Sequence, residues 1–252
     1  MNMSILRNST ITAILLSTLS TSYAQENDHS GYNPNDWHGF IATGPALAPE
    51  FEGSDHYRLL PIPIIRVSKG NYYLQTEGAG FAVNVIDNNN FNAGPVFAYK
   101  PERDEDVNSE IIKTLETIDS TFELGGFVSY GKDLTNPGER VELSVKGLYD
   151  VGNVHDGYTV TGSLSYRTMF QRKYTFGVNL TTTYADEKYN NTYFGVKTTD
   201  AIASGLDLYK AKSGFKDAGA SVNVGYQIND HWGVMAIAGY TRLLSAAKDS
   251  PI

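Results

Sequence analysis

Histidines beside acids are the residues of this 252-residue chain best suited to acid–base chemistry. Asp55 precedes His56, and Asp156 follows His155. Such a pair can activate a water molecule only when both groups face the substrate, and neighbours in a loop do not by themselves do so. The spacing therefore predicts solvated loop residues and no enzyme activity.

The chain offers no stronger catalytic pattern. Ser54 and Ser129 have no histidine at the spacing of neighbouring strands, so a serine triad has little support. An acidic run, Glu102, Asp104, Glu105 and Asp106, could bind a divalent cation or meet lipopolysaccharide through bridging cations. It lacks the alternating spacing of a calcium-binding loop. We expect a charged, solvated loop, with no metal and no cofactor.

The segment "EFEGSD" is a candidate interaction site. Pro49 and Gly53 bracket its acids just outside a predicted strand. One interpretation is a turn that folds over the neighbouring structure, and the other is a loop that binds a ligand. The residues of this candidate loop site are Glu50, Glu52, Asp55, Tyr57 and Arg58.

The first 24 residues are predicted to be a signal peptide. Arg7 precedes an apolar stretch, Ile11 to Leu19, and Ser22-Tyr23-Ala24 supplies the small residues of a cleavage site. The alternative is a short amphipathic helix that stays attached, since the stretch is shorter than the ~20 apolar residues of a membrane-spanning helix. Residues 25–252 then form one domain.

Composition excludes several classes of protein. The chain has no cysteine, so an exported form has no disulfide framework. Its net charge is −8 and it has no runs of Lys or Arg, which gives no reason to expect nucleic acid as a partner.

The main signal is alternation of apolar and polar residues at period two. In "YTVTGSLSYRTMF", Tyr158, Val160 and Leu164 share one face while Thr159 and Ser163 share the other. The strands are about 10 to 13 residues long, whereas soluble strands average ~5 to 6 residues and tilted membrane strands need ~9 to 11. The expected strands span residues 37–47, 58–68, 71–77, 79–86, 91–100, 121–131, 140–150, 158–170, 174–184, 215–228 and 232–243.

Two features favour a membrane barrel over a secreted sandwich. Aromatic residues stand at the ends of the apolar faces, as at Tyr158, Phe170 and Trp232, where interfacial girdles lie. Short turns also alternate with long polar segments at 101–119, 150–157 and 185–213. We therefore predict an all-β, antiparallel transmembrane β-barrel of about 12 strands, in contact with outer-membrane lipid and lipopolysaccharide.

The strand count is odd, which bacterial barrels normally avoid. The short pair around Gly78 and Gly80 is either two strands or one bent strand. With eleven strands, a closing strand is expected beyond Ile252, and a gap is expected between the strands at 37–47 and 232–243.

The inward-facing charges have mixed sign, which favours ion pairs that hold a small barrel shut over an ion-selective ring. The barrel is also below the ~16 strands of open porins. Arg167 is expected to pair with carboxylates of neighbouring strands such as Glu142. The expected lumen charge network is Glu123, Glu142, Lys146, Arg167 and Asp217.

Several segments together resemble the MipA/OmpV family of Gram-negative outer-membrane proteins. They include "APEFEGSDHYRLLPIPIIR", "NAGPVFAYKPERDED", "SGFKDAGASVNVGYQINDHWGV" and "GYTRLLSAAKDSPI". The resemblance implies a small outer-membrane barrel. It also implies, as in the founding member, a scaffold that links a murein-cleaving lytic transglycosylase to a penicillin-binding protein.

Two classes of function stay open at this point. The barrel is either such a scaffold or a channel for small polar solutes, and the family resemblance adds a surface adhesin. Short periplasmic turns such as Asn229-Asp230-His231 offer little docking surface, which counts against the scaffold. The mixed-sign lumen counts against the channel.

Overall fold

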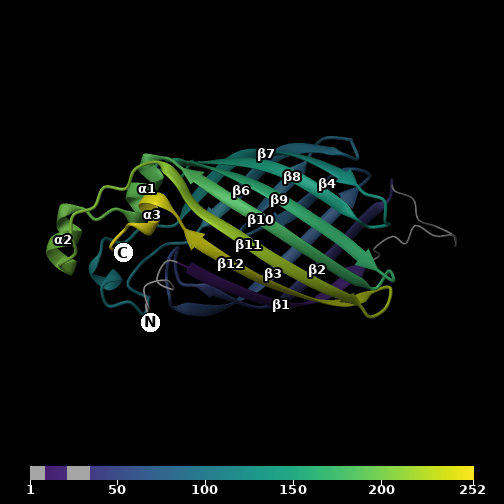
Figure 1. Ribbon diagram of the computed structural model, residues 1–252, viewed down its shortest axis with the longest axis horizontal. Helices are drawn as coiled ribbons and strands as arrows, with labels where there is room; N and C mark the ends of the chain where they lie inside the picture. The colour runs from purple at the N-terminus through teal and green to yellow at the C-terminus, as the bar shows by residue number, and fades with distance from the viewer. Residues whose placement is uncertain (1–8, 22–34) are drawn as a thin grey trace.

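A computed structural model describes residues 9–21 and 35–252 as a closed antiparallel barrel. Each strand pairs with its neighbours in sequence, and β1 pairs with β12 to close the ring (Figure 1). The strands are β1 (Ser9–Thr21), β2 (Trp37–Pro49), β3 (Tyr57–Lys69), β4 (Tyr72–Glu77), β5 (Gly80–Asn84), β6 (Phe91–Lys100), β7 (Thr121–Asp133), β8 (Arg140–Asp150), β9 (Tyr158–Phe170), β10 (Tyr174–Ala185), β11 (Gly214–Gln227) and β12 (Trp232–Leu243).

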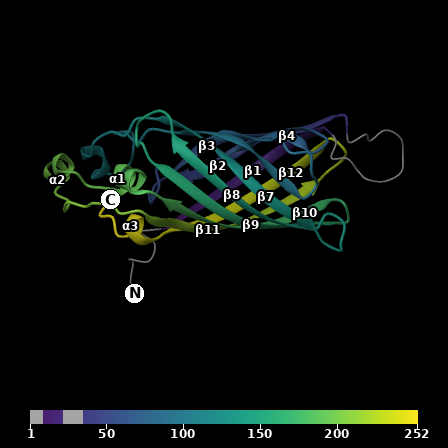
Figure 2. The same ribbon diagram turned by 90° about the horizontal axis from the view of Figure 1, so that it is seen from above.

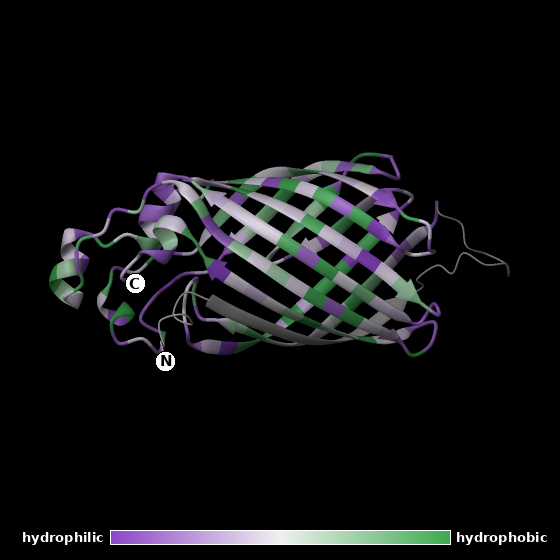
Figure 3. Ribbon diagram, viewed as in Figure 1, coloured by the Kyte–Doolittle hydropathy of each residue, from purple (hydrophilic) through white to green (hydrophobic). Residues whose placement is uncertain are grey.

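The apolar face of the strands points outward. Leu143, Leu164 and Leu180 are each about half exposed on the outer wall, while the alternate positions Ser129 and Thr159 are buried inside. Figure 3 shows apolar and polar positions mixed along the strands of the barrel. A surface of this kind is stable in lipid, because strands paired on both sides satisfy their backbone hydrogen-bonding groups within the barrel.

Aromatic rings collect at both rims of the wall. Tyr158 and Tyr184 stack with their centroids 6.4 Å apart, and Phe215 meets Tyr184 edge-on at 5.9 Å. At the opposite rim the rings of Tyr174 and Tyr226 lie 5.1 Å apart. These positions match the aromatic girdles of membrane barrels.

All eleven strands expected from the alternation are present, as β2 to β12. The doubtful pair is two strands, β4 and β5, joined by a tight turn at Gly78, whose φ of 59° suits a residue without a Cβ. In this region the period-two pattern predicts the fold closely.

The seam of the barrel lies between β2 and β12, which do not pair with each other. The gap expected between these two strands is filled by β1, which pairs with β12 from Ser9 to Leu19 and with β2 from Ala13 to Thr21. This segment is also the apolar part of the predicted signal peptide. Its removal by a signal peptidase stays a prediction.

The two ends of the barrel differ. One end, the loop end, carries the connections 101–120, 151–157 and 186–213, and the other, the turn end, carries short turns. Figures 1 and 2 show the helices gathered at the loop end. They are η2 (Ile112–Thr114), α1 (Glu187–Phe194), α2 (Thr198–Ser204) and α3 (Ser245–Lys248). In the described residues, every helix is too short or too polar to cross a membrane. Outer-membrane barrels place their longer loops outside the cell.

Candidate functional site

Helix α1 is held over the loop end by its first turn. Asp186 is the N-cap residue and accepts a hydrogen bond from the Tyr189 amide at 3.0 Å. The same carboxylate accepts from the Tyr158 amide at 3.1 Å, which ties the helix to the start of β9. Gly157 permits this close approach, because a Cβ there would lie 2.4 Å from the Asp186 carboxylate.

A cluster of charges lies beneath α1. This mouth cluster consists of Glu52, Lys100, Tyr189, Lys216 and Asp217. Its centre is the Oε1 atom of Glu52, which lies 3.3 Å from Lys100 Nζ and 3.1 Å from Lys216 Nζ. The Tyr189 hydroxyl donates to the same oxygen at 3.0 Å and accepts from Lys100. Because these groups come from the β2–β3 loop, β6, β11 and α1, they join distant parts of the rim.

Aromatic rings surround the two ammonium groups. Lys100 Nζ lies 4.6 Å from the centroid of Tyr189 and 4.4 Å from that of Tyr193, both within cation–π range. Burial by itself would raise the pKa of Glu52, but Lys100 and Lys216 outweigh it and hold the pKa well below its usual range. Burial, reinforced by Glu52, raises the pKa of Tyr189. Glu52 is therefore ionised and Tyr189 is a hydrogen-bond donor at neutral pH.

Lys216 enters the cluster through a β-bulge. The register of β10 and β11 shifts between Thr183 and Tyr184, so Tyr184 faces Phe215 and Thr183 faces Asp217. Lys216 is the extra residue, and it points inward together with Asp217. The two side chains pair at 2.6 Å. Strict alternation would have placed Lys216 on the lipid face.

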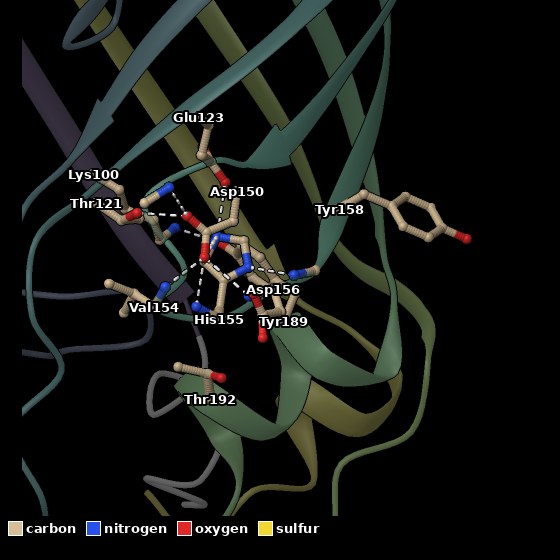
Figure 4. Close-up of polar contacts among 12 residues, drawn as sticks. Lys100, Thr121, Glu123, Asp150, Val154, His155, Asp156, Tyr158, Tyr189 and Thr192 are labelled. Carbon is tan, nitrogen blue, oxygen red and sulfur yellow. Dashed lines mark hydrogen bonds and ion pairs between the residues drawn. The ribbon is translucent and has the colours of Figure 1, made fainter.

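A second cluster, the histidine cluster, lies beside the first and consists of His155, Glu123 and Asp150 (Figure 4). His155 is fully buried, with its Nε2 3.1 Å from Glu123 Oε1. The Gly157 amide donates to its Nδ1 at 3.1 Å, so the proton lies on Nε2 and is donated to Glu123. This assigned tautomer makes His155 a structural donor without access to a substrate.

Asp150 orders the loop that carries His155. Its Oδ2 accepts from the amides of Val154 at 2.8 Å and His155 at 2.6 Å, and Thr121 donates to Oδ1 at 2.5 Å. The rings of Tyr189 and His155 meet edge-on at 5.0 Å. The histidine cluster thus supports α1 from below. Within residues 9–21 and 35–252, no group of three His, Cys, Asp or Glu side chains is placed to hold a metal.

The segment after β12 packs against α1 and the connection 186–213 at the loop end. Ser250 donates to the Phe194 carbonyl at 2.7 Å, and Tyr209 donates to the Ala246 carbonyl at 2.7 Å. Leu243 and Ala247 are buried in the same apolar cluster as Phe194. The "DSP" segment therefore packs on α1.

The lumen is bridged again below the mouth. Lys146 of β8 pairs with Glu77 of β4, although three strands separate β4 from β8 around the ring. Near the turn end, the Arg140 guanidinium lies 3.0 Å from Asp133 and 3.5 Å from Glu142. Ion pairs inside a small barrel hold its walls together.

The charges expected to form one lumen network lie in separate places. Glu123 pairs with His155 and Asp217 with Lys216, both at the loop end. The expected pairing of Arg167 with Glu142 is wrong. Ser165 is the residue opposite Glu142 in the β8–β9 ladder, and the Glu142 carboxylate forms its ion pair with Arg140. Arg167 forms no ion pair with any residue that the structure describes.

The candidate loop site also divides. Only Glu52 turns inward to the mouth cluster, while Glu50 accepts from the Asn108 amide at 2.9 Å. Asp55 and Arg58 are exposed, and Tyr57 begins β3. Of the acids in this loop, Glu52 alone contacts the mouth cluster.

Sequence reasoning missed α1 and its two tyrosines. The segment from Asp186 to Phe194 has an N-cap residue, and Tyr189 and Tyr193 stand four residues apart, which places them on one helical face. The sequence therefore contained a signal for this helix in a segment predicted only as a polar loop. It contained no signal for the partners of the two tyrosines, because those partners lie on the β2–β3 loop, β6 and β11.

A membrane-facing wall, a polar interior and a capped loop end define an outer-membrane β-barrel. The chain belongs to the MipA family, since the family model described as MltA-interacting protein MipA matches residues 41–252. The family resemblance and the outer-membrane location predicted from the sequence are thereby confirmed.

The individual proteins that resemble this chain match it either over a short segment or at low identity. Outer membrane protein Omp26La of Vibrio anguillarum is 41% identical over 73 residues, and the match covers 27% of this chain and 26% of that protein. YiaT of Escherichia coli O157:H7 is 23% identical over 192 residues, covering 76% of this chain and 74% of its own. Among solved structures, the KdgM porin matches 93% of this chain and 98% of its own at 12% identity, with a TM-score of 0.31.

Proposed function

We propose that this protein is a closed outer-membrane anchor that binds murein enzymes from its periplasmic side. The observation that supports this most directly is the mouth cluster. Lys100 and Lys216 stand on strands at different places around the ring, and Glu52 joins them across the opening. An open diffusion porin needs a free path at this level, whereas an anchor does not.

The pair of Lys146 and Glu77 supports the same proposal at a second level. Both side chains are less than half exposed, and their contact crosses the lumen between β8 and β4. A solute would have to pass both this pair and the mouth cluster. Small barrels of this kind commonly fill their interior with side chains.

The choice of partner rests on the family. Its description names an interaction with MltA, so a lytic transglycosylase is the first partner to test, with a penicillin-binding protein as the second. Longer loops face outward in such barrels, so the turn end faces the periplasm, where murein lies. Leu134 and Ile228 are exposed apolar residues just beyond strands at that end, and they offer a contact surface.

A copurification experiment tests the partner. The detergent-solubilised protein is immobilised and mixed with the lytic transglycosylase MltA of the same bacterium. We expect wild type to retain the enzyme, and Leu134→Glu with Ile228→Glu to reduce retention about tenfold or more, because a buried charge at an interface is costly. Ile202→Glu is the matched control, since Ile202 is exposed at the opposite end. Failure of wild type to retain the enzyme would contradict the proposal.

The second function is a channel for small polar solutes, and one observation favours it. The central acid of the mouth cluster, Glu52, belongs to a loop and not to the wall, so the closure can be released without breaking the barrel. Planar-bilayer recording separates the two functions. We expect a small or absent conductance for wild type, and a large stable conductance would favour the channel.

A further inference from the structure

We propose that the mouth cluster is a binding site for a small solute with one carboxylate group, and that Glu52 occupies this site as an internal competitor. The proposal goes beyond the anchor function, because a docking protein does not need a ligand at its outer mouth. It is carried by the contacts, the chain positions and the charges of five side chains.

The two cationic binding groups belong to the wall and the third donor, Tyr189, belongs to α1, whereas their counter-ion belongs to a separate loop. Lys100 is the last residue of β6, and Lys216 is the bulged residue of β11 whose carbonyl accepts from the Leu244 amide at 2.8 Å, so both belong to the wall of the barrel. Glu52 lies in the connection between β2 and β3, which is closed at its base by the hydrogen bond from the Glu50 amide to the His56 carbonyl at 3.0 Å. Glu52 can therefore leave while the barrel and the base of the loop stay intact.

The donors are arranged for a carboxylate oxygen. Three of them converge on Oε1 of Glu52, from Lys100 at 3.3 Å, Lys216 at 3.1 Å and Tyr189 at 3.0 Å, and Tyr189 also lies 3.2 Å from Oε2. Charge-assisted hydrogen bonds of this kind are the strong ones. The site is thus already built around the group that we propose as its ligand.

The local charge selects a monoanion. Lys100 and Lys216 carry two positive charges, and Asp217, 2.6 Å from Lys216, carries one negative charge. When Glu52 leaves, one positive charge has no partner in the cluster. A single carboxylate restores neutrality, whereas a doubly charged phosphate leaves an uncompensated negative charge in a partly buried site.

The surroundings give room for specificity. The rings of Tyr189 and Tyr193 flank Lys100, and both residues are buried. The Tyr193 hydroxyl is buried and has no hydrogen-bond partner among the described residues, so it offers one more polar contact beside the site. Nearby Glu123 does not compete for the ammonium groups, because it accepts from His155. A flat apolar group attached to the carboxylate would therefore meet the rings of Tyr189 and Tyr193.

Acetate is the probe for the test, because it has the CH₂–carboxylate size of the group that Glu52→Ala removes. Binding of ¹³C-labelled acetate to the detergent-solubilised protein is followed by NMR. We expect Glu52→Ala to bind acetate about tenfold or more tightly than wild type, because the internal competitor is gone. Adding Lys216→Met to this variant should reverse the gain, since one lost charge-assisted hydrogen bond is worth about 1.4 kcal/mol or more, or tenfold.

Glu50→Ala is the matched control, because it removes an acid from the same loop outside the cluster. A faster gel mobility of unboiled samples verifies that each variant is a folded barrel. If Glu52→Ala does not fold, Glu52→Gln decides, since an amide keeps the shape but is a weaker competitor. Equal acetate affinity of the folded Glu52 variant, wild type and Glu50→Ala would overturn the proposal.

Discussion

Lys146 and Glu77 form an ion pair across the lumen, from strands that three other strands separate around the ring. The contact therefore joins separate parts of the wall, a third of the way round the ring, and not neighbours in one ladder. Both side chains keep partial exposure, 25% for Lys146 and 35% for Glu77, so the pair is only partly desolvated. The pair places two side chains in the path along the lumen at this level.

Lys146→Met should destabilise the barrel by about 1–2 kcal/mol, because Glu77 loses its partner in a partly buried setting. The matched control is Arg167→Met, which we expect to cost less than about 0.5 kcal/mol, since Arg167 forms no ion pair with any described residue. Urea unfolding of the detergent-solubilised barrel measures both. Equal losses for the two variants would show that the cross-lumen pair adds no stability.

Asp150→Asn should loosen the loop at 151–157. Asn has a single acceptor oxygen, whereas both carboxylate oxygens of Asp150 accept hydrogen bonds from loop amides. We expect a loss of about 2 kcal/mol and faster cleavage of this loop by protease. Asp156→Asn is the control, because Asp156 is exposed and an asparagine suits its φ of 50°. Unchanged cleavage of Asp150→Asn would contradict the role assigned to Asp150.

The stability of the mouth cluster should depend on pH through Glu52. The folded protein lowers the pKa of this carboxyl, so its contribution is fully present above the usual value near 4.5 and is lost as the pH falls through the folded pKa. At pH 7 we expect the free energy of unfolding of wild type to exceed that of Glu52→Gln by about 1–2 kcal/mol, measured by urea unfolding. The difference is no larger because the Glu52 side chain is 36% exposed, and solvent weakens its ion pairs. The difference should persist to about pH 5 and shrink below pH 4. A difference that grows on acidification would contradict this assignment.

The mature protein should begin at Gln25. Cleavage after Ala24 is the prediction from the signal-peptide pattern, and it removes the segment that forms β1 in the seam. Intact-mass spectrometry of the protein extracted from outer membranes gives the answer directly. A mass that includes residues 9–21 would show that β1 belongs to the mature barrel.

The sequence by itself determined the wall of the barrel from β2 to β12 but not β1, whose residues read as the apolar part of a signal peptide. Alternation in segments such as Tyr158 to Phe170 decided where the strands lie and which side chains face lipid, because both follow from the two-residue repeat of an extended chain. The loop end and the turn end also followed from the spacing of the strands. Strand position, the face of each side chain and connection length are local properties, and a few consecutive residues are enough to predict each of them.

Only the tertiary structure decided the site. Lys216 faces inward because a bulge against β10 breaks the alternation, and the sequence of β11 alone does not mark that bulge. Glu52, Lys100 and Tyr189 stand far apart in the chain and meet because barrel closure brings the β2–β3 loop, β6 and α1 to one opening. Likewise Glu142 pairs with Arg140 and not with Arg167, although Arg140 and Arg167 face each other in the ladder between β8 and β9, since the reach and direction of each side chain select the partner. Contacts between distant segments depend on how the whole ring closes. The residue pattern within one strand does not predict them.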